Sequence, residues 1–134
     1  MKTMSNEDKD VLKQINLNIG EYEQQGNWKA LRDYLAIQEL RTGGEAPVLA
    51  FRRASGACVD ARAYLDAVSK GPERTTKITD DDIMPEGDHI AIARCIVERG
   101  GKKYDNLRVF VRDDASSKDW RLLAWANEER KETF

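Results

Sequence analysis

The sequence predicts an α+β domain in which three helices precede a sheet of about four antiparallel strands. Two observations lead to this prediction. Apolar residues recur at three- and four-residue steps through much of the first 70 residues, and from about residue 74 the pattern changes to alternation with a period of two. The length of 134 residues suits one domain, and no repeat, linker or low-complexity segment divides residues 1–134.

The first helix is expected over about residues 6–25. Ser5 followed three residues later by Asp8 has the form of a capping box. An apolar stripe then follows one face of the helix, made by Val11, Leu12, Ile15, Ile19 and Tyr22. Gly26 is expected to end the helix, because glycine is the usual residue just past a helix C-terminus.

Two more helices are predicted by the same signals. Asn27 can cap a shorter helix whose apolar stripe consists of Trp28, Leu31, Tyr34 and Leu35. Asp60 can cap a third helix, with a stripe of Ala61, Tyr64, Leu65 and Val68, and Gly71-Pro72 stops it. Between them, 41–47 is predicted to be a turn and 48–53 a small strand or hairpin.

The second half of the chain is predicted to be a meander of strands. A weak strand over 74–84 ends in a turn at 85–88, and the next strand alternates Ile90, Ile92, Arg94 and Ile96 with Ala91, Ala93, Cys95 and Val97. Gly100-Gly101 is a hairpin signal. The following strand alternates Leu107, Val109 and Val111 with Tyr104, Asn106, Arg108 and Phe110. In the last strand, 120–128, Leu123, Trp125 and Asn127 are expected on one face.

Composition opposes several classes of protein. The 22 basic and 24 acidic side chains give a net charge of −2, whereas nucleic-acid binding draws its affinity from a basic face, so no nucleic-acid partner is expected. The longest apolar run is 122–126, far short of the roughly 20 residues that span a bilayer. The polar start, 1–10, lacks the apolar stretch of a secretory signal, so a cytoplasmic location is expected.

Five stretches of the chain, taken in order, resemble proteins of one superfamily. They are 26–28, 51–56, the predicted helix at 60–68, and the strand residues 104–112 and 120–125. Their order is similar to that of the nuclear-transport-factor-2-like (NTF2-like) superfamily, a cystatin-like α+β group, and the resemblance covers nearly the whole chain. The likeness is greatest to uncharacterised members grouped as SnoaL-like or DUF4440 proteins.

The resemblance implies a cone-like fold, in which three N-terminal helices pack on a curved, mostly antiparallel sheet around a deep pocket. It also implies a homodimer formed through the outer sheet face, where Leu107, Val109 and Val111 would lie. The superfamily includes isomerases, dehydratases, cyclases and proteins without catalysis, so the fold alone assigns no reaction. Ile19, Arg53 and Arg108 stand where isomerase-type relatives would place a catalytic tyrosine and two aspartates. None matches, and the catalytic residues stay unknown.

The same alignment suggests a ligand-binding set on the inner sheet face. Its members are Tyr104, Asn106, Arg108, Phe110, Leu123, Trp125 and Asn127, a mostly apolar lining with a few polar groups. An arginine facing a low-dielectric cavity needs an anionic partner, so the ligand is expected to carry a carboxylate or similar anion held by Arg108. Two alternatives stay open: Arg108 pairs internally with an acidic side chain, or the strand is inverted and Arg108 faces solvent.

Other chemistry-bearing residues have simpler interpretations. His89 is the only histidine and is expected on a solvent-facing turn, and Asp80-Asp81-Asp82 is expected at a solvated strand end. Cys95 is predicted to be a small core residue and Cys58 to be more exposed, with no disulfide, metal site or cofactor. Among the tryptophans, Trp28 is expected in the core, Trp120 at the sheet edge and Trp125 at the pocket.

These observations favour a protein that binds a small, partly apolar anionic metabolite in a cone pocket. A non-catalytic dimeric interaction protein without a functional pocket is an alternative, and so is an isomerase- or dehydratase-type enzyme of the SnoaL-like group. A regulatory module that binds a partner peptide is a weaker one. A cavity of several hundred cubic ångströms would favour ligand binding, whereas a cone filled by side chains would favour the structural role.

Overall fold

A computed structural model describes residues 5–71 and 77–130 of the chain. The described residues form three helices and eight strands: α1 (Asn6–Gln25), α2 (Trp28–Asp33), β1 (Ala36–Glu39), β2 (Glu45–Val48), β3 (Ala50–Arg52), β4 (Cys58–Val59), α3 (Ala61–Lys70), β5 (Lys77–Pro85), β6 (Ile90–Arg99), β7 (Lys102–Val111) and β8 (Arg121–Glu129). The predicted α+β class is confirmed.

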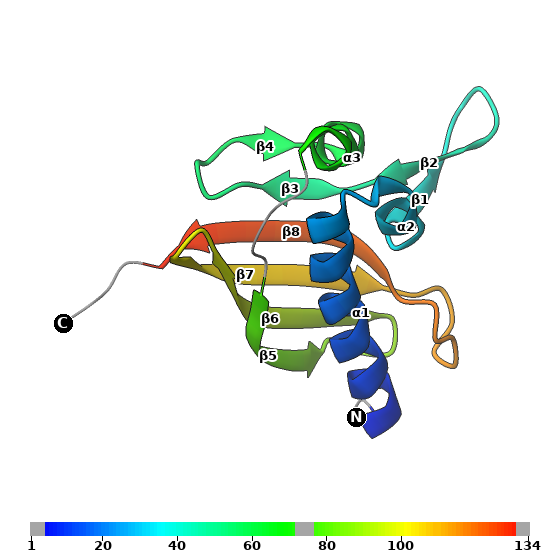
Figure 1. Ribbon diagram of the computed structural model, residues 1–134. Helices are drawn as coiled ribbons and strands as arrows, with labels where there is room; N and C mark the ends of the chain where they lie inside the picture. Colours follow the sequence, from blue (N-terminus) through cyan, green and yellow to red (C-terminus); the bar gives the residue numbers. More distant parts are fainter. Residues whose placement is uncertain (1–4, 72–76, 131–134) are drawn as a thin grey trace.

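One curved sheet of six strands, in the order β4-β3-β8-β7-β6-β5, forms one layer of the molecule (Figure 1). All its pairings are antiparallel except that between β3 and β8, which is parallel. The long helix α1 lies across the face of β5 to β8, and α3 lies beyond β3. The helices therefore cover one face of the sheet, as the sequence predicted.

The helix ends follow the predicted signals. The Ser5 hydroxyl accepts a 3.0 Å hydrogen bond from the Asp8 amide, which starts α1. Gly26 adopts a left-handed conformation (φ 66°) and ends that helix. The side chains of Asn27 and Asp60 accept from the amides of Ala30 and Ala63, so both predicted caps of the later helices are confirmed.

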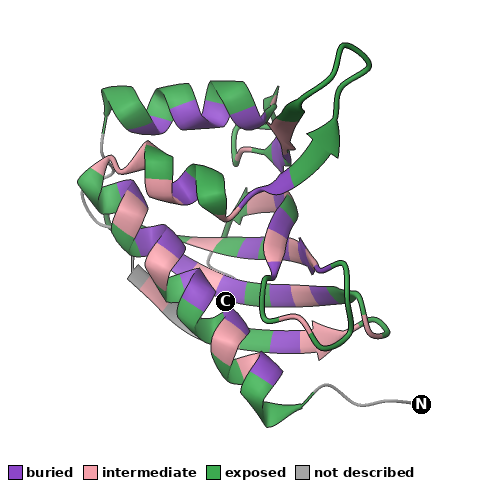
Figure 2. Ribbon diagram, turned by 90° about the vertical axis from the view of Figure 1, so that its right-hand side faces the viewer, coloured by how far each residue is buried: buried purple, intermediate pink, exposed green. Residues whose placement is uncertain are grey.

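Burial separates the two faces of the sheet. Along β6, Ala91, Ala93, Cys95 and Val97 are buried beneath the helices. Along β7 the inner residues Asn106, Arg108 and Phe110 are buried, whereas Leu107 on the outer face is 43% exposed. Figure 2 shows the buried positions gathered between the helices and the sheet. The predicted inner and outer faces of β7 are confirmed.

The segment after α2 differs from the prediction. A second, two-stranded sheet pairs β1 with β2, and their connection extends away from the body of the molecule (Figure 1). Residues 41–47 were expected to be only a turn, yet β2 begins at Glu45 and β1 was not expected at all. β1 has only four residues, of which the first is buried and the other three are exposed, so its sequence shows no alternation that would predict a strand.

A β-bulge also corrects the expected phase of the last strand. Val109 pairs with Ala124 and Phe110 with Leu122, so Leu123 is the extra residue between two pairs. Leu122 is consequently buried at 1% exposure, and Leu123 is 36% exposed. The prediction that Leu123 shares the inner face with Trp125 is wrong, because the bulge shifts the alternation by one residue.

The hydrophobic core lies where α1, α3 and the inner sheet face meet. Its largest fully buried members include Trp120, Phe110 and Leu12. Trp120 was expected at the sheet edge, but it precedes an internal strand and is 1% exposed. Trp28 packs against the core as a partly buried residue. No helix among the described residues is long and apolar enough to span a membrane.

Candidate functional site

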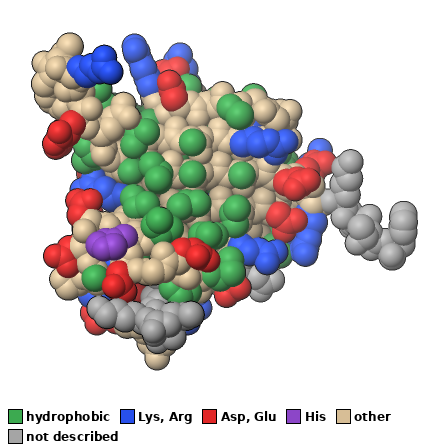
Figure 3. Space-filling model, turned by 180° about the vertical axis from the view of Figure 1, so that it is seen from behind, with side chains coloured by type: hydrophobic (Ala, Val, Ile, Leu, Met, Phe, Trp, Pro, Cys, Tyr) green, Lys and Arg blue, Asp and Glu red, His purple; other side chains and the backbone are tan. Residues whose placement is uncertain are grey.

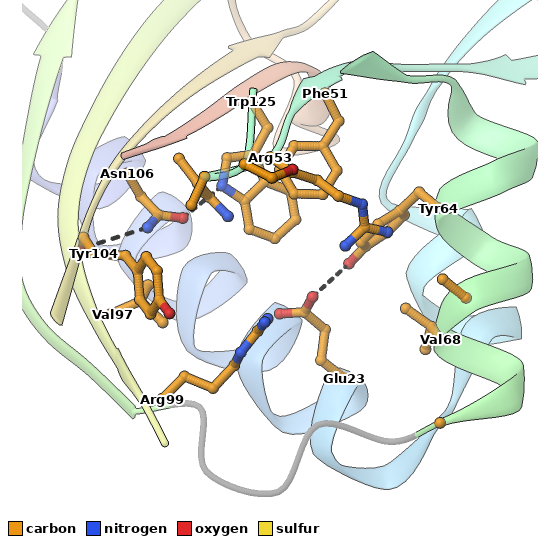
Figure 4. Close-up of a pocket in the computed structure, with 15 residues that line it drawn as sticks. Glu23, Phe51, Arg53, Tyr64, Val68, Val97, Arg99, Tyr104, Asn106 and Trp125 are labelled. Carbon is orange, nitrogen blue, oxygen red and sulfur yellow. Dashed lines mark hydrogen bonds between the residues drawn. The ribbon is translucent and has the colours of Figure 1, made fainter. Parts of the chain in front are cut away.

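A cavity of about 290 Å³ opens at the end of the sheet where β6 turns into β7 (Figure 4). Its walls come from two helices, the segment around β3 and three strands of the sheet. The end of α1 contributes Glu23, and α3 contributes Tyr64, Ala67 and Val68. The segment around β3 contributes Phe51, Arg53, Ala54 and Ser55. The sheet contributes Val97, Arg99, Tyr104, Asn106, Trp125 and Asn127.

Three aromatic rings make one wall of the cavity. The rings of Phe51 and Trp125 stack with centroids 4.5 Å apart and planes 19° apart. Tyr64 meets both edge-on, at 5.5 Å from Phe51 and 5.6 Å from Trp125. Because β3 and β8 pair in parallel with Phe51 opposite Trp125, the sheet register itself holds the stack together. The three rings present an apolar surface to the cavity.

A buried carboxylate and a phenol meet at the cavity. The Tyr64 hydroxyl donates to Oε2 of Glu23 over 3.0 Å, and the two residues are 2% and 8% exposed. Burial raises the pKa of Tyr64 well above its usual value, and the negative charge of Glu23 raises it further, against the opposing effect of Arg108. The phenol therefore stays protonated and keeps donating to Glu23.

Two arginines reach toward the same space from different sides. Figure 4 shows the Arg53 side chain extending toward Tyr64, and that of Arg99 extending from β6 toward Glu23. The Arg53 guanidinium carbon lies 5.3 Å from the centroid of the Phe51 ring, and no acidic side chain of the described residues pairs with it. Arg99 lies over the Tyr104 ring at 5.8 Å.

Amide side chains complete the lining from β7 and β8. The Trp125 indole N–H donates to Oδ1 of Asn106, and Nδ2 of Asn106 donates to the Tyr104 carbonyl. The hydrogen bond from Trp125 fixes the tilt of its ring over the cavity. Oδ1 of Asn127 is buried and has no hydrogen-bond partner among the described residues. It is an unused acceptor in the wall.

The structure brings four of the predicted site residues to the cavity. They are Tyr104, Asn106, Trp125 and Asn127. Phe110 is fully buried in the core instead, and Leu123 is on the outer face because of the bulge. Whether the four bind a ligand stays a prediction.

Arg108 has the predicted inward direction but does not reach the cavity wall. It is 0% exposed, lies over the Trp125 ring at 4.3 Å, and donates from Nη1 to Oδ1 of Asn16 over 3.1 Å. The alternative of an inverted strand is wrong. The alternative of an acidic internal partner is also wrong within the described residues, since the partner is a neutral amide.

The remaining candidate residues lie away from the cavity. His89 is exposed, and its Nδ1 lies 3.2 Å from the Arg112 carbonyl. Cys58 is exposed and Cys95 is buried as predicted, and burial raises the pKa of the Cys95 thiol. Asp81 is half-buried and Asp82 exposed, and both lie in the middle of β5, so the prediction of a strand end is wrong; the side chain of Asp80 is outside the described residues. Within 5–71 and 77–130, no three His, Cys, Asp or Glu side chains gather as metal ligands would.

Glu23, Tyr64 and Arg99 line the cavity but were not among the predicted site residues. Glu23 stands four residues after Ile19, on the apolar stripe of α1, and a charged residue in that position signals a buried partner. Tyr64 was assigned to the core stripe of α3, which is correct, but its hydroxyl needed a partner. Arg53 was considered only as a mismatch to a catalytic aspartate.

Comparisons with known proteins yield matches in structure alone. No family model matches the chain, and no curated protein matches its sequence. An NTF2-like protein of unknown function from Silicibacter pomeroyi is 13% identical with a TM-score of 0.70, covering 96% of this chain and 100% of its own. An NTF2-like protein of unknown function in nutrient uptake from Rhodospirillum rubrum is 16% identical with a TM-score of 0.63, covering 92% and 96%.

A third similar structure is a CaMKII hub. The CaMKII hub of S. rosetta is 18% identical with a TM-score of 0.59, and the match covers 90% of this chain and 95% of the hub. These likenesses span nearly the full length of both chains in each pair. They do not single out SnoaL-like or DUF4440 proteins, so that narrower resemblance stays a prediction. The helices packed on a curved antiparallel sheet, together with these matches, show that the chain has the NTF2-like fold.

Proposed function

We propose that the cavity binds a small, partly apolar anionic molecule. The observation that carries this proposal is Arg53, a cation directed toward an aromatic-walled cavity of about 290 Å³ with no acidic partner among the described residues. A ligand carboxylate near Arg53 would gain a charge-assisted hydrogen bond. The apolar part of the ligand would lie against Trp125 and Phe51.

The charges of the lining favour an anion over a cation. Among the described lining residues, Arg53 and Arg99 are basic and Glu23 is acidic. Glu23 already accepts a hydrogen bond from Tyr64, which disperses part of its charge. The excess of positive charge in a partly desolvated space favours a ligand of opposite sign.

A panel of small aromatic and aliphatic carboxylates, each with its primary amide, tests this proposal by thermal shift at constant ionic strength. We expect carboxylates with an apolar part to raise the unfolding midpoint of the wild-type protein, and Arg53→Gln to weaken their binding about tenfold or more, the size of a lost charge-assisted hydrogen bond. Arg62→Gln, an exposed site on α3, removes the same charge elsewhere and should leave binding unchanged. The proposal fails if no carboxylate shifts the midpoint, or if Arg53→Gln responds like the wild type.

The outer sheet face favours a second role, a homodimer. Figure 3 shows apolar side chains gathered over this face with charged side chains around them. Leu107 is 43% exposed, Ile90 39% and Leu123 36%, and Val109 and Val111 are half-buried beside them. A second copy of the chain would bury this surface against itself, as self-complementary interfaces do.

Light scattering after gel filtration tests the dimer. We expect the wild-type protein to be dimeric at high micromolar concentration and Leu107→Glu to be a folded monomer, since a charge in the centre of an apolar interface is costly. Leu17→Glu changes a leucine on α1 that is 50% exposed and should remain dimeric. A monomeric wild-type protein, or a dimer unaffected by Leu107→Glu, would refute an interface at this face.

A further inference from the structure

Two buried arginines follow one another along the inner side of the sheet. Arg108 lies on β7 and Arg112 directly after it, four residues apart, so both point to the same face. They are 0% and 9% exposed. Each lies over an indole ring, Arg108 over Trp125 at 4.3 Å and Arg112 over Trp120 at 4.2 Å. Their surroundings are otherwise very different.

Arg112 has acceptors for two of its three guanidinium nitrogens, one of them a carboxylate. Its Nη1 lies 3.0 Å from Oδ1 of Asp8 and 2.9 Å from the Ser117 carbonyl, and its Nε donates to the Asp88 carbonyl over 2.8 Å. The carboxylate of Asp8 neutralises the guanidinium charge. A buried arginine that is paired and hydrogen-bonded in this way is a stable structural element.

Arg108 lacks the equivalent acceptors. Its one hydrogen-bond partner is Oδ1 of Asn16, which lies on the same helix as Asp8 and two turns further along. Nε and Nη2 of Arg108, and Nδ2 of Asn16, are buried without a partner among the described residues. Three N–H-bearing nitrogens and a positive charge thus lack an acceptor. Leaving such groups unpaired in the interior is costly, so an acceptor is expected to occupy this place.

We propose that Arg108 and Asn16 form an inner anion subsite that receives the carboxylate of the cavity's ligand. The subsite adjoins the cavity, which Trp125 and Asn106 line. Arg108 lies over the Trp125 ring and follows Asn106 by two residues on the same strand. Because Arg108 is 0% exposed, entry of the anion requires the Trp125 ring to leave the stacked position that it has in this structure. This assignment rests on the proposed function, and it gives the bound anion a second cation, Arg108, in addition to Arg53.

The pair formed by Arg112 and Asp8 suggests the decisive substitution. Asn16→Asp keeps the shape of the side chain and gives Arg108 the internal carboxylate that Arg112 already has. We expect formate, titrated against gluconate at constant ionic strength, to raise the unfolding midpoint of the wild-type protein. In Asn16→Asp the concentration giving half of this effect should rise at least about tenfold. Gln14→Glu, an exposed site on α1, adds the same charge and should respond like the wild type.

A crystal of the wild-type protein grown in sodium bromide provides a second measurement that needs no variant. We expect an anomalous bromide peak within hydrogen-bonding distance of Nε or Nη2 of Arg108. Water alone at this place, or an equal formate response in the wild type and Asn16→Asp, overturns the subsite. If Arg53→Gln weakens binding of the carboxylate panel and Asn16→Asp does not, the cavity still binds anions and only the subsite is refuted. If the formate effect depends on Asn16 but no panel carboxylate binds, the proposed function fails instead.

Discussion

Three polar residues on the buried face of α1 interact with residues from distant parts of the chain. Asp8 pairs with Arg112, Asn16 with Arg108, and Glu23 with Tyr64. The spacings of eight and seven residues keep all three on one helix face. The first pair is a complete ion pair, the second leaves a cation without a counter-charge, and the third places a carboxylate at the cavity. The structural ion pair and the polar groups of the proposed ligand site therefore share one helix face.

Breaking the pair of Asp8 and Arg112 is expected to reduce stability, because one charge would stay buried without its partner. Burial tends to raise the pKa of the Asp8 carboxyl, but hydrogen bonds from Lys118, Arg112 and Ser5 and the charge of Arg112 together lower it below its usual value. A carboxyl whose pKa is lower in the folded than in the unfolded state stabilises the protein above about pH 4. This stabilisation is lost as the pH falls through the folded pKa.

Asp8→Asn should accordingly lower the free energy of unfolding by about 3 kcal/mol at neutral pH, because Arg112 is left buried without its carboxylate. Denaturant unfolding at several pH values measures the effect, and the gap from the wild type should narrow below about pH 4. Asp10→Asn, an exposed site on the same helix, is the control and should change little. An effect no larger than that of Asp10→Asn, or a gap that widens in acid, would contradict this account.

At the level of elements, the turn between α1 and α2 depends on one glycine. Gly26 has φ 66°, its amide donates to the Glu23 carbonyl, and the Asn27 amide donates to the Tyr22 carbonyl over 2.9 Å. This places the end of α1, and with it Glu23, beside the cavity. A side chain is strained in the left-handed region by about 1 kcal/mol or more.

Gly26→Ala should therefore lower the free energy of unfolding by about 1 kcal/mol, measured by chemical denaturation. Gly71 supplies the matched control, because it ends α3 in an extended conformation (φ −155°) with open space around its Cα. Gly71→Ala should cost little or even stabilise slightly. Equal losses of unfolding free energy in the two variants would show that the left-handed conformation of Gly26 does not determine the effect.

The elements that could be predicted are those with long, regular patterns. The apolar stripes and caps of α1 and α3 and the alternation along β6 and β7 were sufficient to assign them. β1 was missed because four residues carry too short a pattern. The bulge at Leu123 was missed because an extra residue in one strand can be recognised only from its pairing with the neighbouring strand.

The sequence predicted only those residues of the candidate site that follow from the alternation of inward and outward side chains along a strand. Tyr104, Asn106, Trp125 and Asn127 follow from the alternation of two strands. Glu23 and Tyr64 are 41 residues apart in the sequence and lie on different helices, so they meet only because these helices pack together in the fold. Arg108 was correctly placed inside, but its neutral partner Asn16, on a distant helix, could not be inferred from its own strand.

For the whole molecule, the two faces of one sheet have different properties. The inner face, under α1 and α3, holds an aromatic cavity with excess positive charge, and the outer face is an apolar surface with charged surroundings. The net charge of −2 spread over 46 charged side chains gives no sign of either. The proposed function depends instead on a few arginines that the fold buries or places beside the cavity.

The central claim is that this cavity selects a negative charge. Titration of the wild-type protein with the tightest-binding carboxylate of the panel and with its primary amide, followed by tryptophan fluorescence at constant ionic strength, tests it most directly. The two ligands have nearly the same shape and differ in charge. The account predicts that the carboxylate binds at least about tenfold more tightly than the amide. An amide that binds as tightly as the carboxylate would contradict it.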